Sequence, residues 1–268
     1  MIDTIEFNQS RARKISEYIT VFCSEEINPS ELPNTLLDDY VQSYDIAMSR
    51  LSEVLIPDED CKVDIYITTC KSDLKALLGD FFVGEIGSRL GFVSSGIYIA
   101  YFSEDELQKV KAGKIRNNLN GLCHEFIHIL LPSYVMSDNI KVSHYLTSIF
   151  KEGISVILSN QIKKHDEINN EVCIRNILNN GINSFSNNII EENFAYQYVA
   201  ELVRRTDILL SKNLGNNSTP NLFSLLHFIK DRVNISENNI FNNLRVELGI
   251  DVSQVERELR IEWGMSEI

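Results

Sequence analysis

The sequence has no long hydrophobic run, and basic residues are in the minority. No apolar stretch approaches the roughly 18 residues that a membrane-spanning helix needs, so no membrane span is expected. The 25 lysines and arginines are outnumbered by 38 aspartates and glutamates, which gives a formal net charge of -13. A surface of that charge repels phosphate backbones, and no basic patch with interleaved aromatic residues offsets it. We therefore expect no nucleic-acid partner.

Cysteine is scarce, and a secretion signal is not visible. The five cysteines are odd in number, scattered, and form no Cys-x-x-Cys pair, so we expect reduced thiols. The first six residues carry acids where a signal peptide needs bases, and no apolar core follows them. Both observations favour a cytoplasmic protein, with export by a route that uses no recognisable signal left open.

Hydrophobic periodicity divides the chain into a mixed first half and a helical second half. Amphipathic helices are predicted near residues 9–23 and 36–55, and strands at 63–68 and 96–102. A short helix is predicted at 72–78, before a glycine-rich region of turns. Further helices are predicted at 104–112, 115–131, 142–160, 191–210, 222–233, 238–248 and 253–262.

These elements predict an α+β fold in one compact unit. Its parts would be N-terminal helices (1–56), a small mixed α/β subdomain (57–131) and a helical subdomain (132–268).

The most informative segment is His124-Glu125-Phe126-Ile127-His128. Two histidines four residues apart lie on one face of a helix and can share one metal ion, and the intervening acid can reach a water on that ion. The residues around them are apolar on almost every side, so the helix should be buried. Burying these polar groups is costly unless a cation partners them. An ordinary helix with core histidines is the alternative.

Two protein ligands are too few for zinc, so a third must come from elsewhere. Leu131 and Tyr134 stand where a metzincin has glycine and histidine. Glu152 fits better, because it lies on the next strong helix and the chain can turn back after Pro132. The neighbouring Gly153 is unusual inside a helix and predicts close packing against the helix that carries the histidines.

The segment 124–128, followed by Lys151-Glu152-Gly153-Ile154, resembles the pattern of gluzincins, a group of zinc metallopeptidases. The likeness covers roughly residues 60–268. It implies a zincin-like fold, with the active-site helix at the junction of the sheet and the helical part. It also implies one Zn²⁺ per chain, bound by His124, His128 and Glu152, with Glu125 as the general base.

The resemblance implies further site residues. Residues 193–202 are similar to a tyrosine-bearing helix of the family, which implies Tyr196, with Tyr198 in reserve, as the donor that stabilises the oxyanion. Either tyrosine has a core role as its alternative. His144 and Tyr145, predicted two turns before Glu152 on its helix, are further candidates. The strand at 96–102 resembles the family's edge strand, which could pair with an extended substrate.

Two departures from the family pattern shape the functional prediction. Val156 stands where many gluzincins carry an acid or amide that orients the first histidine, so that partner must come from elsewhere. No acidic motif for capturing a substrate amino terminus is found, which favours an endopeptidase.

The sequence thus predicts zinc-dependent hydrolysis of a peptide or protein substrate. A non-catalytic binding or regulatory module braced by zinc is the alternative, and a metal-free helical interaction protein is the third hypothesis.

Overall fold

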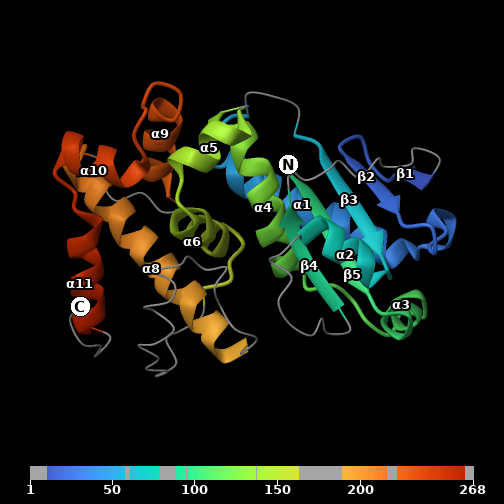
Figure 1. Ribbon diagram of the computed structural model, residues 1–268. Coiled ribbons are helices and arrows are strands. Elements are labelled where there is room, and N and C mark those ends of the chain that lie inside the picture. The colour runs from blue at the N-terminus through green and yellow to red at the C-terminus, as the bar shows by residue number, and fades with distance from the viewer. Residues whose placement is uncertain are drawn as a thin grey trace. The chain divides into compact units, whose positions relative to one another are not determined.

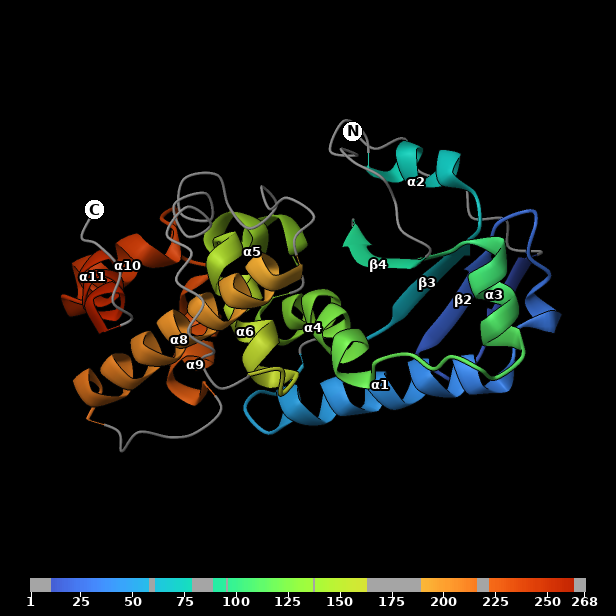
Figure 2. The ribbon, with the colours of Figure 1, turned by 90° about the horizontal axis from the view of Figure 1, so that it is seen from below.

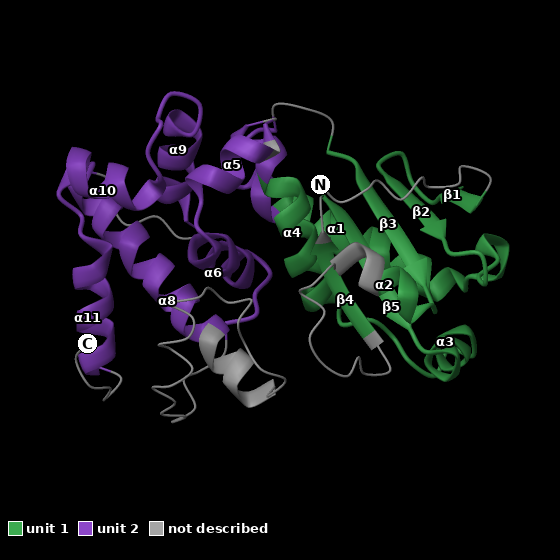
Figure 3. Ribbon diagram, viewed as in Figure 1, with its two compact units in different colours: residues 1–49, 60–131 green, residues 50–59, 132–268 purple. Residues whose placement is uncertain are grey.

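The structure is a computed structural model that describes residues 11–57, 61–78, 89–94, 96–136, 138–162, 189–215 and 222–262. They form the predicted α+β fold, with a five-stranded mixed sheet and several helices. The chain divides into two compact units (Figure 3). The first contains residues 1–49 and 60–131, and the second contains residues 50–59 and 132–268. No helix in these described ranges is long and apolar enough to cross a membrane.

The sheet belongs to the first unit, and its strands follow the order β1-β2-β3-β5-β4 (Figure 1). The strands β2, β3 and β5 are parallel, while β1 and β4 run antiparallel to their neighbours. Their bounds are Ala12–Lys14 (β1), Ile19–Cys23 (β2), Val63–Thr68 (β3), Arg89–Ser94 (β4) and Ile97–Phe102 (β5). The helix α3 (Glu104–Lys111) follows β5 and begins at the cap residue Ser103.

Both faces of the sheet are covered within this unit, and Figure 2 shows α1 and α2 on opposite faces. The register aligns Ile65 with Tyr98 on the face that meets α1 (Asn34–Ser52) and α4 (Leu119–Val135). The ring of Tyr98 forms T-shaped pairs with the rings of Tyr40 and Phe126, at centroid distances of 6.1 and 5.7 Å. On the other face, Leu74 of α2 (Lys71–Leu78) closes a second apolar cluster.

The start of α4 is fixed to α1 by polar contacts. The buried carboxylate of Asp39 accepts hydrogen bonds from Arg116 Nε (3.1 Å) and from the backbone N–H of Asn117 (3.0 Å). The hydroxyl of Ser43 donates to the carbonyl oxygen of Leu119 at 3.2 Å. These bonds attach the first residue of α4, and the residues directly before it, to α1.

The helix predicted at residues 9–23 is wrong, because its described part contains β1 and β2. The strand β2 lies between β1 and β3, and its residues are almost all buried. Strands buried on both faces read as continuous apolar runs instead of alternating ones. The spacing of Ile15, Ile19 and Phe22 imitates a helical stripe.

The strand β4 was not predicted, since it lies in a glycine-rich region. Gly91 pairs with Ala100, and a Cβ at Gly91 would collide with the Tyr98 hydroxyl. The predicted strand at 96–102 is β5, but it lies between β3 and β4 and is therefore not the edge. Among the described strands, β4 is the outer one on that side.

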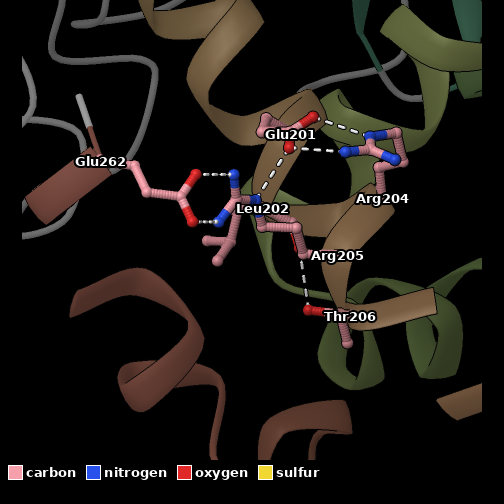
Figure 4. A network of polar contacts seen from close by, with 6 residues as sticks. All are labelled: Glu201, Leu202, Arg204, Arg205, Thr206 and Glu262. Atoms are coloured by element: carbon pink, nitrogen blue, oxygen red, sulfur yellow. Dashed lines mark hydrogen bonds and ion pairs between the residues drawn. The ribbon is translucent and has the colours of Figure 1, made fainter. Parts of the chain in front are cut away.

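The second unit consists of helices arranged around α8 (Ile189–Asn213), which contacts α6, α9 and α11. Figure 4 shows that Arg205 of α8 binds two carboxylates, Glu201 on the same helix and Glu262 on α11. The helices of this unit are α5 (Asn139–Tyr145), α6 (Ser148–Leu158), α9 (Phe223–Arg232), α10 (Ile240–Leu248) and α11 (Val252–Glu262).

Residues 50–59 belong to the second unit, although residues 50–52 are still part of α1. The ring nitrogen Nε2 of His227 lies 3.1 Å from the carbonyl oxygen of Val54. Lys230 Nζ donates to the carbonyl oxygen of Ile56 at 3.0 Å. These two α9 side chains thus bind the backbone at Val54 and Ile56.

Two predicted boundaries are wrong. The helix α4 continues through Pro132 to Val135 instead of turning there. The single helix predicted at 142–160 is two helices, because Leu146 and Thr147 are extended and Thr147 is the N-cap residue of α6. His144 and Tyr145 therefore lie on α5 and not on the helix of Glu152.

Gly153 permits a close approach between α6 and α8. A Cβ there would meet Val203 Cγ2 at 2.5 Å and the carbonyl oxygen of Val199 at 2.7 Å. The close packing that the glycine indicated is present, but its partner is α8, where we had expected the helix that carries the histidines. At Gly121 in α4, by contrast, a Cβ would meet nothing nearer than 3.6 Å.

We expect Gly153→Ala to lower the free energy of unfolding by about 1–3 kcal/mol, because the added methyl group overpacks the contact with α8. Urea unfolding followed by circular dichroism measures the change. Gly121→Ala is the matched control and should raise the stability by up to about 1 kcal/mol through helix propensity alone. Equal stability of Gly153→Ala and the wild type would contradict the packing described above.

Candidate metal centre

The two histidines of α4 lie one helical turn apart, and their rings face each other. Their Nε2 atoms are 3.1 Å apart, and the ring centroids are 4.8 Å apart at an angle of 79°. His124 is buried and His128 is half-buried. The apolar neighbours expected around them are present, since Leu122, Phe126, Ile127, Leu130 and Leu131 are all buried.

Glu152 completes a group of three possible metal ligands with His124 and His128. One ligand atom of each side chain lies within 4.8 Å of the other two. Glu152 is half-buried on α6, directly before Gly153, whose contact with α8 fixes the position of this turn. The structure thus brings together the three residues that the sequence selected, in a group that could hold a metal ion.

The donor atoms fit a divalent transition-metal ion. With bonds of about 2.05 Å and tetrahedral angles, two nitrogen ligands of one ion lie about 3.3 Å apart. The 3.1 Å between the two Nε2 atoms is close to that value. The carboxylate oxygen has to move inward by no more than about 1.5 Å to reach the same spacing. Imidazole and carboxylate donors suit several first-row ions.

Without an ion, one imidazole has to donate a hydrogen bond to the other. Neutral imidazole has one N–H donor and one acceptor nitrogen, so an N–H···N bond is possible at 3.1 Å. Two protonated rings would repel each other at this distance. Glu152 adds a negative charge to the group, which would favour a cation between the two nitrogens.

Burial lowers the pKa of Lys151, and the neighbouring carboxylate of Glu152 opposes that shift. Lys151 lies on α6 and is half-buried, so its ammonium group loses hydration there.

Glu125 is half-buried on α4 beside His124. It projects about 100° further around the helix than His124 does. Its predicted role as a base stays a prediction.

The two candidate tyrosines on α8 differ in environment. Tyr198 is fully buried, and its hydroxyl donates to Glu256 Oε1 at 3.1 Å. The same oxygen accepts from Nε of the buried Arg260 at 2.8 Å. Burial, followed by the charge of Glu256, raises the pKa of Tyr198. These contacts favour the core alternative for Tyr198, whereas Tyr196 is half-buried and remains the first candidate for the oxyanion donor.

The other candidates are also placed on the fold. His144 is exposed and Tyr145 is buried, both on α5. Val156 is fully buried in α6, so this position offers His124 no polar partner. The outer strand β4 is a feature that the sequence did not reveal, because its glycines resemble turn signals.

No protein-family model matches the chain, and a search of curated proteins finds no similar sequence.

We expect the purified protein to bind about one transition-metal ion per chain, and Glu152→Ala and His128→Ala to lose it on dialysis. Loss of even an outer partner of a ligand costs ten- to hundredfold in metal affinity, and loss of a ligand costs more. Elemental mass spectrometry after dialysis measures the content. Glu104→Ala, which removes an exposed acid from α3, is the control.

Removing the metal with a chelator should also lower the melting temperature of the wild type, because a ligand bound only to the folded state stabilises it. Equal metal content in the wild type and Glu152→Ala would remove Glu152 from the site.

Proposed function

We propose that the chain is a zinc-dependent peptidase of the gluzincin type that acts as an endopeptidase. The observation that carries the proposal is the group of His124, His128 and Glu152, whose donor atoms lie within 4.8 Å of one another. Two histidines and a glutamate are a known ligand set of catalytic zinc, which keeps its remaining position open for water or substrate.

His124, His128 and Glu152 would hold the ion. Zinc in such a site lowers the pKa of water to about 7 and polarises a carbonyl group.

Glu125 is proposed as the general base. Glu125 follows His124 directly on α4, so its carboxylate projects from the helix next to the pair of imidazole rings. It is not one of the three candidate metal ligands. The carboxylate takes a proton from the attacking water and passes it to the nitrogen of the leaving amine. Tyr196 is proposed to donate a hydrogen bond to the carbonyl oxygen as negative charge develops there.

The outer strand β4 is proposed to align the substrate. Among the described strands it pairs only with β5, so the other edge of its backbone can bind an extended peptide. The strand β5 lies next to β4 and also contacts α4, the helix of the two histidines. The contact is made by Tyr98 of β5, which packs on Phe126, two residues after His124. Strand pairing recognises main-chain groups on both sides of a bond, which suits an endopeptidase.

We expect Glu125→Gln to retain its metal but to lose peptide hydrolysis by at least about a hundredfold, because the amide cannot accept the proton. Cleavage of a mixed peptide library, followed by mass spectrometry, measures the activity beside the metal content. Glu104→Gln is the control for the charge change and should cleave as the wild type does.

Unchanged turnover in Glu125→Gln would contradict the proposed mechanism. A wild type that binds one zinc ion and cleaves no member of the library would instead favour the zinc-braced binding module.

A further inference from the structure

The outer strand β4 carries two apolar side chains on one face of the sheet. The register places Leu90 opposite Tyr101 and Phe92 opposite Ile99. Residues directly opposite each other in a sheet share a face, and Tyr101 and Ile99 belong to the apolar cluster that Leu74 of α2 closes. Leu90 and Phe92 therefore lie on the α2 face, two residues apart.

Both side chains keep part of their surface exposed at the rim of this cluster. Leu90 and Phe92 are half-buried and pack against the cluster from outside. Among the described strands, none pairs with the outer side of β4. Unpaired main-chain groups beside partly exposed apolar side chains form a template on which an extended peptide can add as a strand. The cluster itself consists of Phe22, Tyr66, Leu74, Ile99 and Tyr101.

The other face of β4 is the one that meets α4. Val93 lies opposite Tyr98, whose ring contacts Phe126 of the helix that carries the two histidines. The side chains of a peptide added to β4 alternate between these two faces. One set lies on the α4 face, and the other set lies beside Leu90 and Phe92 on the α2 face.

We propose that β4 selects substrates with apolar residues at two positions separated by one residue, whose side chains contact Leu90 and Phe92. This selection rests on the proposed peptidase function and names its substrate class. Main-chain pairing binds any extended sequence, whereas side-chain contacts at alternate positions discriminate between sequences. A charged residue at either position loses hydration beside two apolar side chains and gains no partner from them, so it is disfavoured.

The test is the cleavage profile of the wild type on the mixed peptide library, read by mass spectrometry as residue frequencies around the cleaved bonds. We expect leucine, isoleucine, valine and phenylalanine to be enriched about three- to fivefold at two positions separated by one, because each cross-strand apolar pair contributes modestly. The two positions should lie at a fixed distance from the cleaved bond. Aspartate, glutamate and lysine should be depleted there.

Phe92→Thr and Leu90→Thr test the contacts one at a time. Threonine retains strand propensity but offers less apolar surface, so each variant should remove the preference at one of the two positions, and a different one in each case. Ile97→Thr is the matched control. Ile97 is half-buried against the same cluster but lies on β5, one strand in from the edge, so this variant should retain both preferences.

A second measurement needs no variant of the protein. Synthetic copies of the best-cleaved peptide, each N-methylated at one residue, lack one amide donor apiece. A strand directs every second amide toward its neighbour. Across the stretch that contains the apolar pair, N-methylation should therefore lower the cleavage rate at least about fivefold at alternate residues only.

The outcomes separate this selection from the peptidase function. Cleavage without an apolar pair, a profile unchanged in both β4 variants, or N-methyl effects that do not alternate would overturn the selection and leave the peptidase standing. No cleavage of any library member would overturn the peptidase and the selection with it. Dimerisation in sedimentation experiments that Phe92→Thr abolishes would assign the outer edge of β4 to a second copy of the chain, which also overturns the selection.

Discussion

Two imidazole nitrogens held 3.1 Å apart on a buried helix can accommodate one proton or one cation between them, but not two protons. Much of the first unit serves to hold this pair in place. The sheet supports α4 through the contact of Tyr98 with Phe126, and α1 fixes the start of the helix through Asp39 and Ser43. A ligand pair that is organised in advance in this way would bind a metal ion with little further cost of ordering.

The elements that could be predicted from the sequence are those whose local pattern agrees with their environment. The strand β3 and the helices α1, α3 and α9 have clear periodicity and clear boundaries, and the structure has them close to the expected positions. The strand β2 was misjudged because both of its faces are buried, so its sequence does not alternate between apolar and polar residues. The strand β4 was missed because Gly91 suggested a turn. In the structure the missing side chain of Gly91 leaves room for the ring of Tyr98. The break between α5 and α6 at Leu146 and Thr147 has neither glycine nor proline to mark it.

The residues of the candidate site also differ in how far the sequence could predict them. The histidine pair follows from a spacing of four residues, which is a property of any helix. The presence of Glu152 in the group could be expected because a third ligand was needed and few acids were suitably placed. The environment of Tyr198 could not be predicted, because Glu256 and Arg260 are distant in sequence and have no motif. Gly153 signalled close packing correctly, but nothing in the sequence indicates that α8 is the partner.

The path of the chain limits how the protein can diverge. Residues 50–59 come before β3 in the sequence, yet their carbonyl groups at Val54 and Ile56 are bound by His227 and Lys230 of α9. A recombination point anywhere between residues 60 and 222 would take these acceptors from one parent and their donors from the other. Both bonds lie within the second unit, and their acceptors are backbone carbonyl groups, which any residue supplies, so the bonds persist as long as positions 227 and 230 keep hydrogen-bond donors. Related sequences should accordingly vary more freely at positions 54 and 56 than at positions 227 and 230.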